Sequence, residues 1–238
     1  MLLLNVILQL LALIIILVIL YLILASVFFK REIESALERD PAATSPIEIM
    51  LTYSGFHAIV MHRITHALRR VKMPFLPRFL SQVGKLITGI EIHPGATIGK
   101  NLFIDHGMGV VIGETTIIGD NVTLFQGVTL GGTGKEKGKR HPTLGNNIVV
   151  GTGAKILGNI VIGDNVSIGA NAVVLRDVPP NSTVVGVPGR IARREGQKVP
   201  GINLDYTSLP DPLANSLERL QEEIDKIESE MKDWHEKK

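Results

Sequence analysis

Cysteine is absent from the 238 residues, and aromatic side chains make up only 5% of them. The lack of cysteine excludes disulfides, cysteine-ligated zinc and a cysteine nucleophile. The net charge is only +2, and no basic stretch carries interleaved aromatic residues, so the sequence gives no indication of a nucleic-acid partner. With so few aromatic residues, the core is expected to consist of isoleucine, valine and leucine.

Aliphatic residues instead recur every six positions over much of the chain, and a glycine often follows them. A period of six fits neither an α-helix nor an alternating strand. It is typical of short strands joined by tight corners in a parallel β-helix, in which each aliphatic residue stacks on its counterpart one coil away. The period is carried by Ile92, Ile98, Ile104, Ile112, Ile118, Leu124, Leu130, Leu144, Val150, Ile156, Ile162, Ile168 and Val174.

Two steps in this period are irregular. The step from Ile104 to Ile112 is eight residues long, and the step from Leu130 to Leu144 is fourteen. A solenoid has no structural need for such breaks, and insertions in repeat proteins map to loops on one face, often the binding face. The two breaks therefore indicate where a functional site lies.

Residues 2–29 form an almost wholly apolar segment. A helix of this length would reach about 42 Å, enough to cross the roughly 30 Å hydrocarbon core of a bilayer. A signal peptide is the competing interpretation, but it needs a positive charge before the apolar run and a shorter run. We therefore predict an uncleaved transmembrane anchor over residues 1–29. Lys30 and Arg31 then favour a cytoplasmic catalytic part and a single-pass position in the inner cell membrane.

Four further segments follow the predicted anchor. Residues 30–88 are expected to form a short helical domain interrupted by prolines, and residues 89–195 are expected to form the β-helix. Residues 196–212 have the composition of a linker. Residues 213–238 carry apolar residues in steps of four and three, which predicts a coiled-coil helix that self-associates. An amphipathic helix lying on its own domain is the alternative.

Histidines in two parts of the chain raise the question of a metal site. In the helical segment His62 and His66 share one helix face, but no HExxH pattern is present, so packing roles are favoured. The histidines of the predicted β-helix form no close pair, which also disfavours a metal. These are His93, His106 and His141.

Polar residues gather where the period breaks. His106 follows Asp105 in the eight-residue step, and Arg140 and His141 lie in the fourteen-residue step. A general base is usually a histidine oriented by a carboxylate, and the spacing puts Glu91 on a coil adjacent to His106. The plainer interpretation of His106 is a corner histidine bonded to backbone. The glycine-rich start of the loop lacks the GxxxxGK[ST] pattern, which argues against a nucleoside triphosphatase.

Several stretches in and around these breaks are distinctive. They are Asp-His-Gly at 105–107, Val-Ile-Gly-Glu-Thr at 111–115, Val-Thr-Leu-Gly-Gly-Thr-Gly-Lys at 128–135, Arg-His-Pro at 140–142, Gly-Ala-Lys-Ile-Leu-Gly-Asn-Ile at 153–160 and Gly-Val-Pro-Gly-Arg at 186–190. In these stretches the chain resembles the serine O-acetyltransferase family, and the resemblance extends from about Arg39 to Arg190. Many acyl and nucleotidyl transferases share the hexapeptide period, but GGTGK followed by RHP is specific to this branch.

The resemblance implies a mainly β protein with a left-handed parallel β-helix that forms a homotrimer, with active sites between subunits. The implied reaction is acetyl transfer from acetyl-CoA, the co-substrate, to the hydroxyl of L-serine, with no metal. Its product is O-acetyl-L-serine for cysteine biosynthesis. His106 would be the general base. Glu91, where well-known members have aspartate, would orient it.

The same resemblance assigns the binding residues. Asp40 and Asp105 would bind the serine ammonium. Arg140 would pair with the serine carboxylate through its forked donors, and His141 would line the same pocket. The residues that would line the acetyl-CoA groove are Gly132, Thr152 and Ala170.

The chain also departs from the family. Thr152 stands where alanine is common, the helical domain is short, and the final Glu-Lys-Lys lacks the isoleucine that docks into a sulfhydrylase, which disfavours that complex. Two alternative functions stay open: a membrane-anchored O-acetyltransferase acting on an envelope sugar, and a membrane-tethered trimeric scaffold. Asp40 with Arg140 favours serine, because a pair that binds a zwitterion has no obvious use on a neutral sugar.

Overall fold

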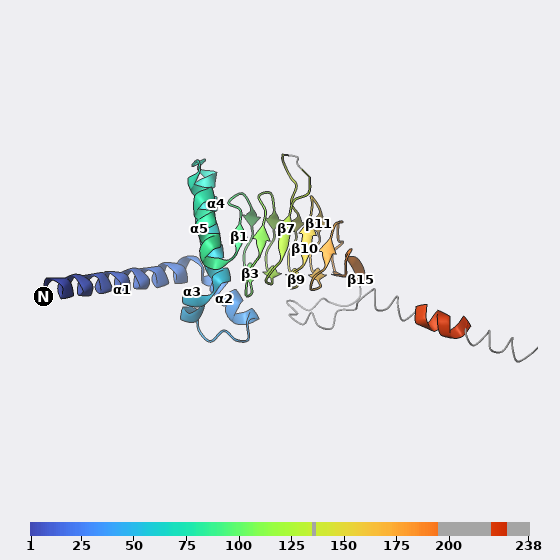
Figure 1. Ribbon diagram of the computed structural model, residues 1–238, viewed down its shortest axis with the longest axis horizontal. Coiled ribbons are helices and arrows are strands. Elements are labelled where there is room, and N and C mark those ends of the chain that lie inside the picture. Colours follow the sequence, from blue (N-terminus) through green and yellow to red (C-terminus); the bar gives the residue numbers. More distant parts are fainter. Residues whose placement is uncertain (135–136, 195–219, 228–238) are drawn as a thin grey trace, which may run out of the picture.

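Three narrow sheets wind around one axis and form a parallel β-helix (Figure 1). The computed structural model describes residues 1–134, 137–194 and 220–227. The strands of successive coils pair in parallel, and among the described residues only β15 pairs antiparallel, with β14. Sheet A contains β1 (Glu91–Ile92), β4 (Val111–Ile112), β7 (Thr129–Gly131), β10 (Lys155–Leu157) and β13 (Val173–Val174); sheet B contains β2 (Thr97–Ile98), β5 (Ile117–Ile118), β8 (Thr143–Leu144) and β11 (Val161–Ile162); sheet C contains β3 (Phe103–Ile104), β6 (Thr123–Leu124), β9 (Val149–Val150), β12 (Ser167–Ile168), β14 (Ser182–Val185) and β15 (Arg190–Arg194).

The aliphatic residues of the six-residue period fill the inside of the β-helix, as predicted. Ile92 pairs with Ile112 in sheet A, and Ile98 pairs with Ile118 in sheet B, so each side chain stacks on its counterpart. Every residue of the period is buried, with at most 7% of its surface exposed. Burying a side chain of this size contributes about 1.5–3 kcal/mol, so the stacked columns account for much of the stability of the fold.

The turns of successive coils stack into three columns. The histidine corner leads from sheet C to sheet A, the loop corner from sheet A to sheet B, and the asparagine corner from sheet B to sheet C. The histidine corner comprises residues 105–110, 125–128, 151–154 and 169–172. The described part of the loop corner comprises residues 93–96, 113–116, 132–134, 137–142 and 158–160. The asparagine corner comprises residues 99–102, 119–122, 145–148, 163–166 and 179–181.

The asparagine corner is a structural ladder. The five asparagines that form the ladder have positive φ values, which asparagine tolerates better than most residues. Each of the first four also donates its side-chain amide to the asparagine of the next coil, at 2.8–3.1 Å. This column holds the coils in register and leaves the other two corners for function. The ladder consists of Asn101, Asn121, Asn147, Asn165 and Asn181.

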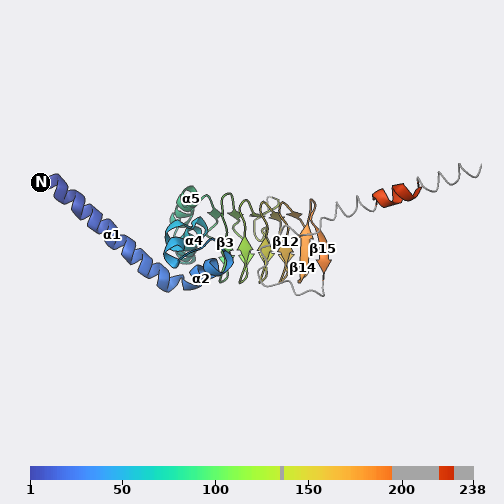
Figure 2. The same cartoon turned by 90° about the horizontal axis from the view of Figure 1, so that it is seen from below.

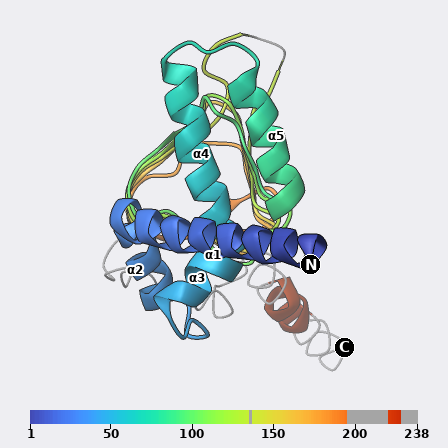
Figure 3. The same ribbon diagram turned by 90° about the vertical axis from the view of Figure 1, so that its left-hand side faces the viewer.

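Helices α4 and α5 pack side by side across the open first coil of the β-helix (Figure 3). Prolines define several of the helix boundaries, as predicted: α3 begins at Pro46, and Pro77 lies in the first turn of α5. The helices are α1 (Leu2–Phe28), α2 (Lys30–Arg39), α3 (Pro46–Thr52), α4 (Ser54–Arg70) and α5 (Leu76–Thr88).

Two arginines tie these helices to the first coils. Arg39, at the end of α2, is buried and donates to the carbonyl oxygens of Asn101 and Val122 at 3.1 and 3.3 Å. Arg63, in α4, donates to the carbonyl oxygen of Ile98 at 2.6 Å. Buried carbonyl groups need such partners. These contacts also fix the segment that follows α2, where one predicted binding residue lies.

Helix α1 extends away from the other helices and from the β-helix and is exposed along most of its length (Figure 2). Its segment Leu3–Phe28 is long and apolar enough to cross a membrane, with a mean hydropathy of 3.3, but a signal sequence would pass the same test. At the other end, residues 220–227 are helical. The predicted linker (196–212) and the rest of the predicted heptad helix (213–219 and 228–238) lie outside the described residues.

Candidate active site

His106 is presented outward by a tight turn of the histidine corner, between β3 and β4. His106 and Gly107 have positive φ values of 56° and 76°. Glycine adopts this conformation freely, but a histidine adopts it only where its surroundings impose it. Helix α4 supplies such a contact, because the Ser54 hydroxyl donates to the His106 carbonyl oxygen at 3.1 Å. The imidazole is 72% exposed and is therefore free to reach a ligand.

Two carboxylates lie beside His106. Asp105 Oδ2 is 4.0 Å from His106 Nε2. Burial raises the pKa of Asp105; the charge of His106 opposes this rise, and the charge of Asp40 adds to it. Asp40 follows α2, and its Oδ2 accepts a 2.6 Å hydrogen bond from the Tyr53 hydroxyl. The negative charges of two neighbouring carboxylates beside an imidazole suit a cationic group.

In the described part of the chain, Glu91 has hydrogen-bond partners in α5 and none at His106, so its role in orienting His106 stays a prediction. Its carboxylate accepts hydrogen bonds from Lys85 at 2.6 Å and from Arg78 at 3.2 Å, both in α5. The Lys85 hydrogen bond outweighs the effect of burial and lowers the pKa of Glu91. Spacing correctly placed Glu91 near the histidine corner, since β1 pairs with β4. It could not reveal that α5 packs against β1 and binds the carboxylate.

Arg140 belongs to a second group, in the loop corner. Its Nη2 donates to Glu114 Oε2 at 2.8 Å, and Arg69 of α4 donates to Glu114 Oε1 at 2.9 Å. The Arg140 hydrogen bond outweighs the effect of burial and lowers the pKa of Glu114. One carboxylate thus holds two guanidinium groups. A guanidinium has five N–H donors, so Arg140 keeps donors for an anionic ligand.

His141 lies beside Arg140, and its hydrogen bonds indicate its protonation state. Its Nδ1 accepts from the Thr115 N–H at 3.2 Å, and the Thr115 hydroxyl is 2.9 Å away. That hydroxyl oxygen accepts from the N–H groups of Arg140 and His141, so its own proton is directed at Nδ1. Burial lowers the pKa of His141, which favours the neutral ring. The neutral ring then carries its proton on Nε2, and His141 offers an Nε2–H donor.

The residues predicted to line the acetyl-CoA groove divide between the two corners. Thr152 and Ala170 stack in the histidine corner, one coil apart, since β9 pairs with β12 and the Asn171 N–H donates to the Thr152 carbonyl oxygen at 2.8 Å. Gly132 lies in the loop corner, where a Cβ would be 3.1 Å from Arg140 Cγ. One protomer therefore brings two of these residues together and leaves the third on another corner.

The predicted site residues thus form two half-sites. The histidine half-site contains Asp40, Asp105 and His106, and it follows β3. The loop half-site contains Arg140 and His141, and it precedes β8. Sheet A lies between these corners. Within the described part of one chain, the two half-sites do not meet.

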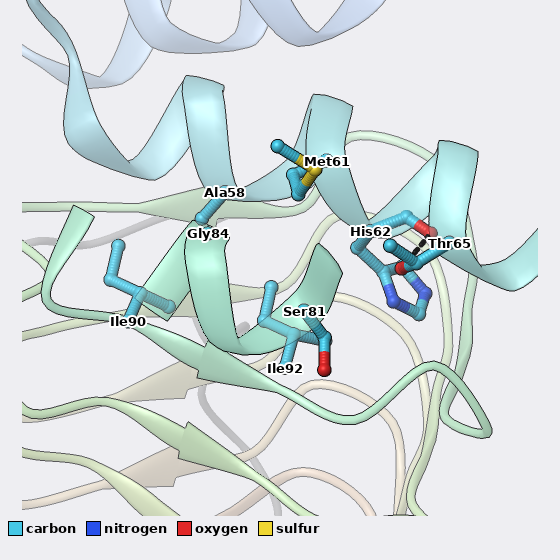
Figure 4. Close-up of a pocket in the computed structure, with 8 residues that line it drawn as sticks. All are labelled: Ala58, Met61, His62, Thr65, Ser81, Gly84, Ile90 and Ile92. Carbon is cyan, nitrogen blue, oxygen red and sulfur yellow. Dashed lines mark hydrogen bonds between the residues drawn. The ribbon is translucent and has the colours of Figure 1, made fainter. Parts of the chain in front are cut away.

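No group of three or more histidine, aspartate or glutamate side chains in the described part of the chain is placed to hold a metal ion. His62 instead borders a cavity between α4 and α5 (Figure 4). The cavity has a volume of about 10 Å³, room for roughly one water molecule, and cannot hold a substrate. The His62 ring lies 5.5 Å from that of His66, and burial is the main cause that lowers the pKa of His62 to about 3.

Sequence reasoning missed two side chains that shape the half-sites. Tyr53 bonds Asp40 from the junction of α3 and α4, and no motif surrounds it. Thr115 organises the backbone of Arg140 and His141. Its position inside the Val-Ile-Gly-Glu-Thr stretch was an available signal, whereas the contact of Tyr53 depends on how the helices pack.

Comparisons with known proteins agree with this architecture. A family model described as bacterial transferase hexapeptide (six repeats) matches residues 141–176. The chain is 56% identical over 202 residues to a serine acetyltransferase of Bacillus pumilus (strain SAFR-032), covering 85% of this chain and 93% of that protein. It also resembles the solved serine acetyltransferase of Neisseria gonorrhoeae in complex with serine (44% identity, TM-score 0.67, 69% of this chain and 67% of that chain). The solved enzyme of Brucella abortus strain S19 in complex with coenzyme A is similar to the same degree (43% identity, TM-score 0.69, 72% and 68%).

These comparisons overturn the predicted location in the inner membrane. The relatives are serine acetyltransferases, which are typically soluble cytoplasmic enzymes. The prediction rested on the length and apolar composition of α1 alone, which is weak evidence for a membrane span because signal sequences share both properties.

Proposed function

The chain belongs to the serine acetyltransferase family and transfers an acetyl group from acetyl-CoA to the hydroxyl of L-serine, and from this premise we propose which of its side chains carry the reaction. The product is O-acetyl-L-serine for cysteine biosynthesis. The observation that supports the assignment is the division of acidic and basic groups between the two half-sites. Serine is a zwitterion, and each half-site suits one of its charges.

The histidine half-site binds the serine ammonium. Asp105 and Asp40 supply negative charge beside His106. The loop half-site binds the serine carboxylate, because the forked donors of Arg140 match a carboxylate and the Nε2–H of His141 adds a further donor. The serine hydroxyl then lies between the two, within reach of the exposed His106 imidazole.

His106 acts as the general base. Its neutral imidazole takes the hydroxyl proton as the serine oxygen attacks the thioester carbonyl carbon, and a tetrahedral intermediate forms. The C–S bond then breaks, and the imidazolium returns its proton to the leaving thiolate. Asp105, at 4.0 Å, stabilises the imidazolium in place of the predicted Glu91. General base catalysis contributes about 10²–10⁴-fold. Direct transfer needs no acyl-enzyme, and the chain has no cysteine to form a thioester with the acetyl group.

The functional unit is a homotrimer of left-handed β-helices. A threefold arrangement of triangular coils sets the histidine corner of one subunit beside the loop corner of the next. This joins the two half-sites and also joins Thr152 and Ala170 with Gly132 of the partner subunit along an acetyl-CoA groove. Residues 30–88 and 89–195 serve as the helical and catalytic domains of each subunit. The alternative acceptor, an envelope sugar, was favoured mainly by the predicted membrane location. Because that location is contradicted, the alternative loses its main support.

The purified full-length protein tests this function through release of the coenzyme A thiol. We expect turnover with acetyl-CoA and L-serine and little with L-homoserine or glucosamine. His106→Ala should lose at least about 100-fold in kcat while keeping the assembly and the thermal midpoint. A higher kcat/KM for glucosamine or homoserine would reject serine as the acceptor. A His106→Ala enzyme of near-normal kcat would reject the assigned base.

A further inference from the structure

Both oxygens of the Asp40 carboxylate have hydrogen-bond donors within the chain. The Tyr53 hydroxyl donates to Oδ2 at 2.6 Å, and the Ala42 N–H donates to Oδ1 at 2.8 Å. The bond from Ala42 belongs to the local turn after α2, a common arrangement for aspartate. The bond from Tyr53 comes from another pair of helices, so it determines which way the carboxylate faces.

Tyr53 sits on a segment that is itself fixed. It ends α3 and precedes α4, and it packs against the apolar cluster of the helical region. The two residues that follow it bind the β-helix. The Ser54 hydroxyl bonds the His106 carbonyl oxygen, and a Cβ at Gly55 would lie 2.1 Å from a carbonyl oxygen at the end of β3. One short segment therefore contacts both the acidic subsite and the turn that presents His106.

The charges in this subsite explain why a tyrosine suits the position. The charge of Asp40 raises the pKa of Asp105, in addition to the larger effect of burial, so the two carboxylates repel each other. A lysine or arginine in place of Tyr53 would hold Asp40 but would cancel the charge that attracts an ammonium group. A hydroxyl is a neutral donor, and burial together with the bond to Asp40 raises the pKa of Tyr53, so the proton stays on its oxygen at neutral pH.

We propose that Tyr53 is the positioning residue of the ammonium subsite and thereby sets the preference for an amino acid over the corresponding hydroxy acid. The inference rests on the proposed function, in which Asp40 and Asp105 bind the serine ammonium. Tyr53 does not touch the reacting atoms. It holds Asp40 facing the ligand, so its loss weakens binding of the ammonium group and leaves the transfer step intact.

The test compares L-serine with L-glycerate, in which a hydroxyl replaces the ammonium group, on the full-length enzyme. Tyr53→Phe should raise the KM for serine about tenfold, with kcat and the KM for acetyl-CoA changed less than about twofold. The inhibition constant of glycerate should not change, so the preference for serine over glycerate falls about tenfold. Tyr21→Phe is the matched control, since the Tyr21 hydroxyl bonds the Met50 carbonyl oxygen at 2.8 Å beside the same apolar cluster. This control should leave the preference unchanged.

Asp40→Asn separates this inference from the proposed function. If Asp40→Asn raises the serine KM and Tyr53→Phe does not, the ammonium subsite stands and the role of Tyr53 is rejected. If neither variant changes the serine KM, the subsite itself is wrong. Equal weakening of serine and glycerate by Tyr53→Phe would indicate a general structural role and also reject the inference.

Two further variants complete the test. Tyr53→Phe added to Asp40→Asn should raise the serine KM no further, because both changes act through one carboxylate; an additional tenfold rise would contradict this. Should Tyr53→Phe fail to fold, Tyr53→His retains a donor on a ring, and it must keep a preference for serine that Tyr53→Leu loses. Equal preferences in these two variants would overturn the role of the hydroxyl.

Discussion

The imidazole of His141 lies directly against Gly113, so closely that a Cβ on the glycine would be 1.9 Å from His141 Cδ2. The two residues belong to successive turns of the loop corner. Where the long loop returns to the β-helix, the His141 ring therefore packs on the backbone of Gly113, which carries no side chain. Glycine is required at position 113 for this close contact with the His141 ring. The contact in turn fixes the direction of the His141 Nε2–H.

Gly113→Ala should displace His141 and weaken serine binding. We expect the serine KM to rise about tenfold, as for loss of a hydrogen bond to a charged group, while the KM for acetyl-CoA changes little. Initial rates with each substrate varied in turn give both constants. The substitution should also lower the thermal midpoint, because overpacking a well-packed site destabilises a protein. An unchanged serine KM would show that His141 does not contact serine.

Glu91→Gln tests whether this carboxylate orients His106 or anchors α5. The hydrogen bonds from Lys85 and Arg78 favour the anchor, so kcat should fall less than about threefold. The lowered pKa of Glu91 means that its charge stabilises the fold above the ordinary glutamate pKa of about 4.3, and that this stabilisation disappears as the pH falls through the lowered value.

Thermal melts of Glu91→Gln and the unmodified protein check both expectations. The variant should melt lower at pH 7, and the difference should shrink below about pH 4. The loss will be small, because partly exposed ion pairs are worth at most about 1 kcal/mol. A kcat reduced 100-fold or more at pH 7 would restore Glu91 as the partner of His106.

The contrast between Glu91 and the repeat residues shows what the sequence could predict. The six-residue period is a local signal, so the inner stack from Ile92 to Val174 and the positions of the two irregular steps could be predicted directly from it. The partners of Glu91 come from α5, and the partner of Asp40 comes from the α3–α4 junction. Such contacts depend on how helices pack on the β-helix, which no spacing along the chain encodes. The split into two half-sites likewise follows from the corner on which each residue falls.

Asp105→Asn should make the protein more stable and less active. Burial raises the pKa of Asp105, so the folded state holds its proton more tightly than the unfolded state does. The ionised carboxylate therefore costs stability as the pH rises through the raised pKa, and a neutral asparagine avoids that cost. At pH 7 the variant should melt about 2 °C or more above the unmodified protein, with a higher serine KM.

The pH dependence provides the control for Asp105→Asn. Well below the ordinary aspartate pKa of about 3.9 the carboxyl is protonated in both states, so the gain in thermal midpoint should vanish there. Scanning calorimetry at pH 7 and at about pH 3, roughly one unit below the ordinary aspartate pKa, measures both differences at constant ionic strength. A gain that persists at the lower pH would have to come from packing and would contradict the electrostatic explanation.

Two inactive variants should restore activity when they share an assembly. His106→Ala destroys the histidine half-site and Arg140→Ala destroys the loop half-site, so each variant alone has low activity. A heterologous interface joins two different surfaces, here the histidine corner of one subunit and the loop corner of the next. In an equal random mixture each of these corners is intact in about half of the subunits, so about a quarter of the junctions contain both intact half-sites. Co-expression followed by purification through two different tags keeps only the trimers that contain both variants. One of the three sites in such a trimer is intact, so roughly a third of the normal kcat per site should be recovered.

The matched control pairs His106→Ala with Asp105→Ala, two changes in the same half-site. No arrangement of these subunits contains an intact histidine half-site, so their mixture should show no recovery. Recovery in the first mixture and not in the second requires that neighbouring subunits share each active site. Absence of recovery in both, with mixed trimers confirmed by native mass spectrometry, would place the complete site within one chain. Arg140 and His106 would then have to meet through a rearrangement of the fourteen-residue loop step, since they lie on different corners in the single protomer.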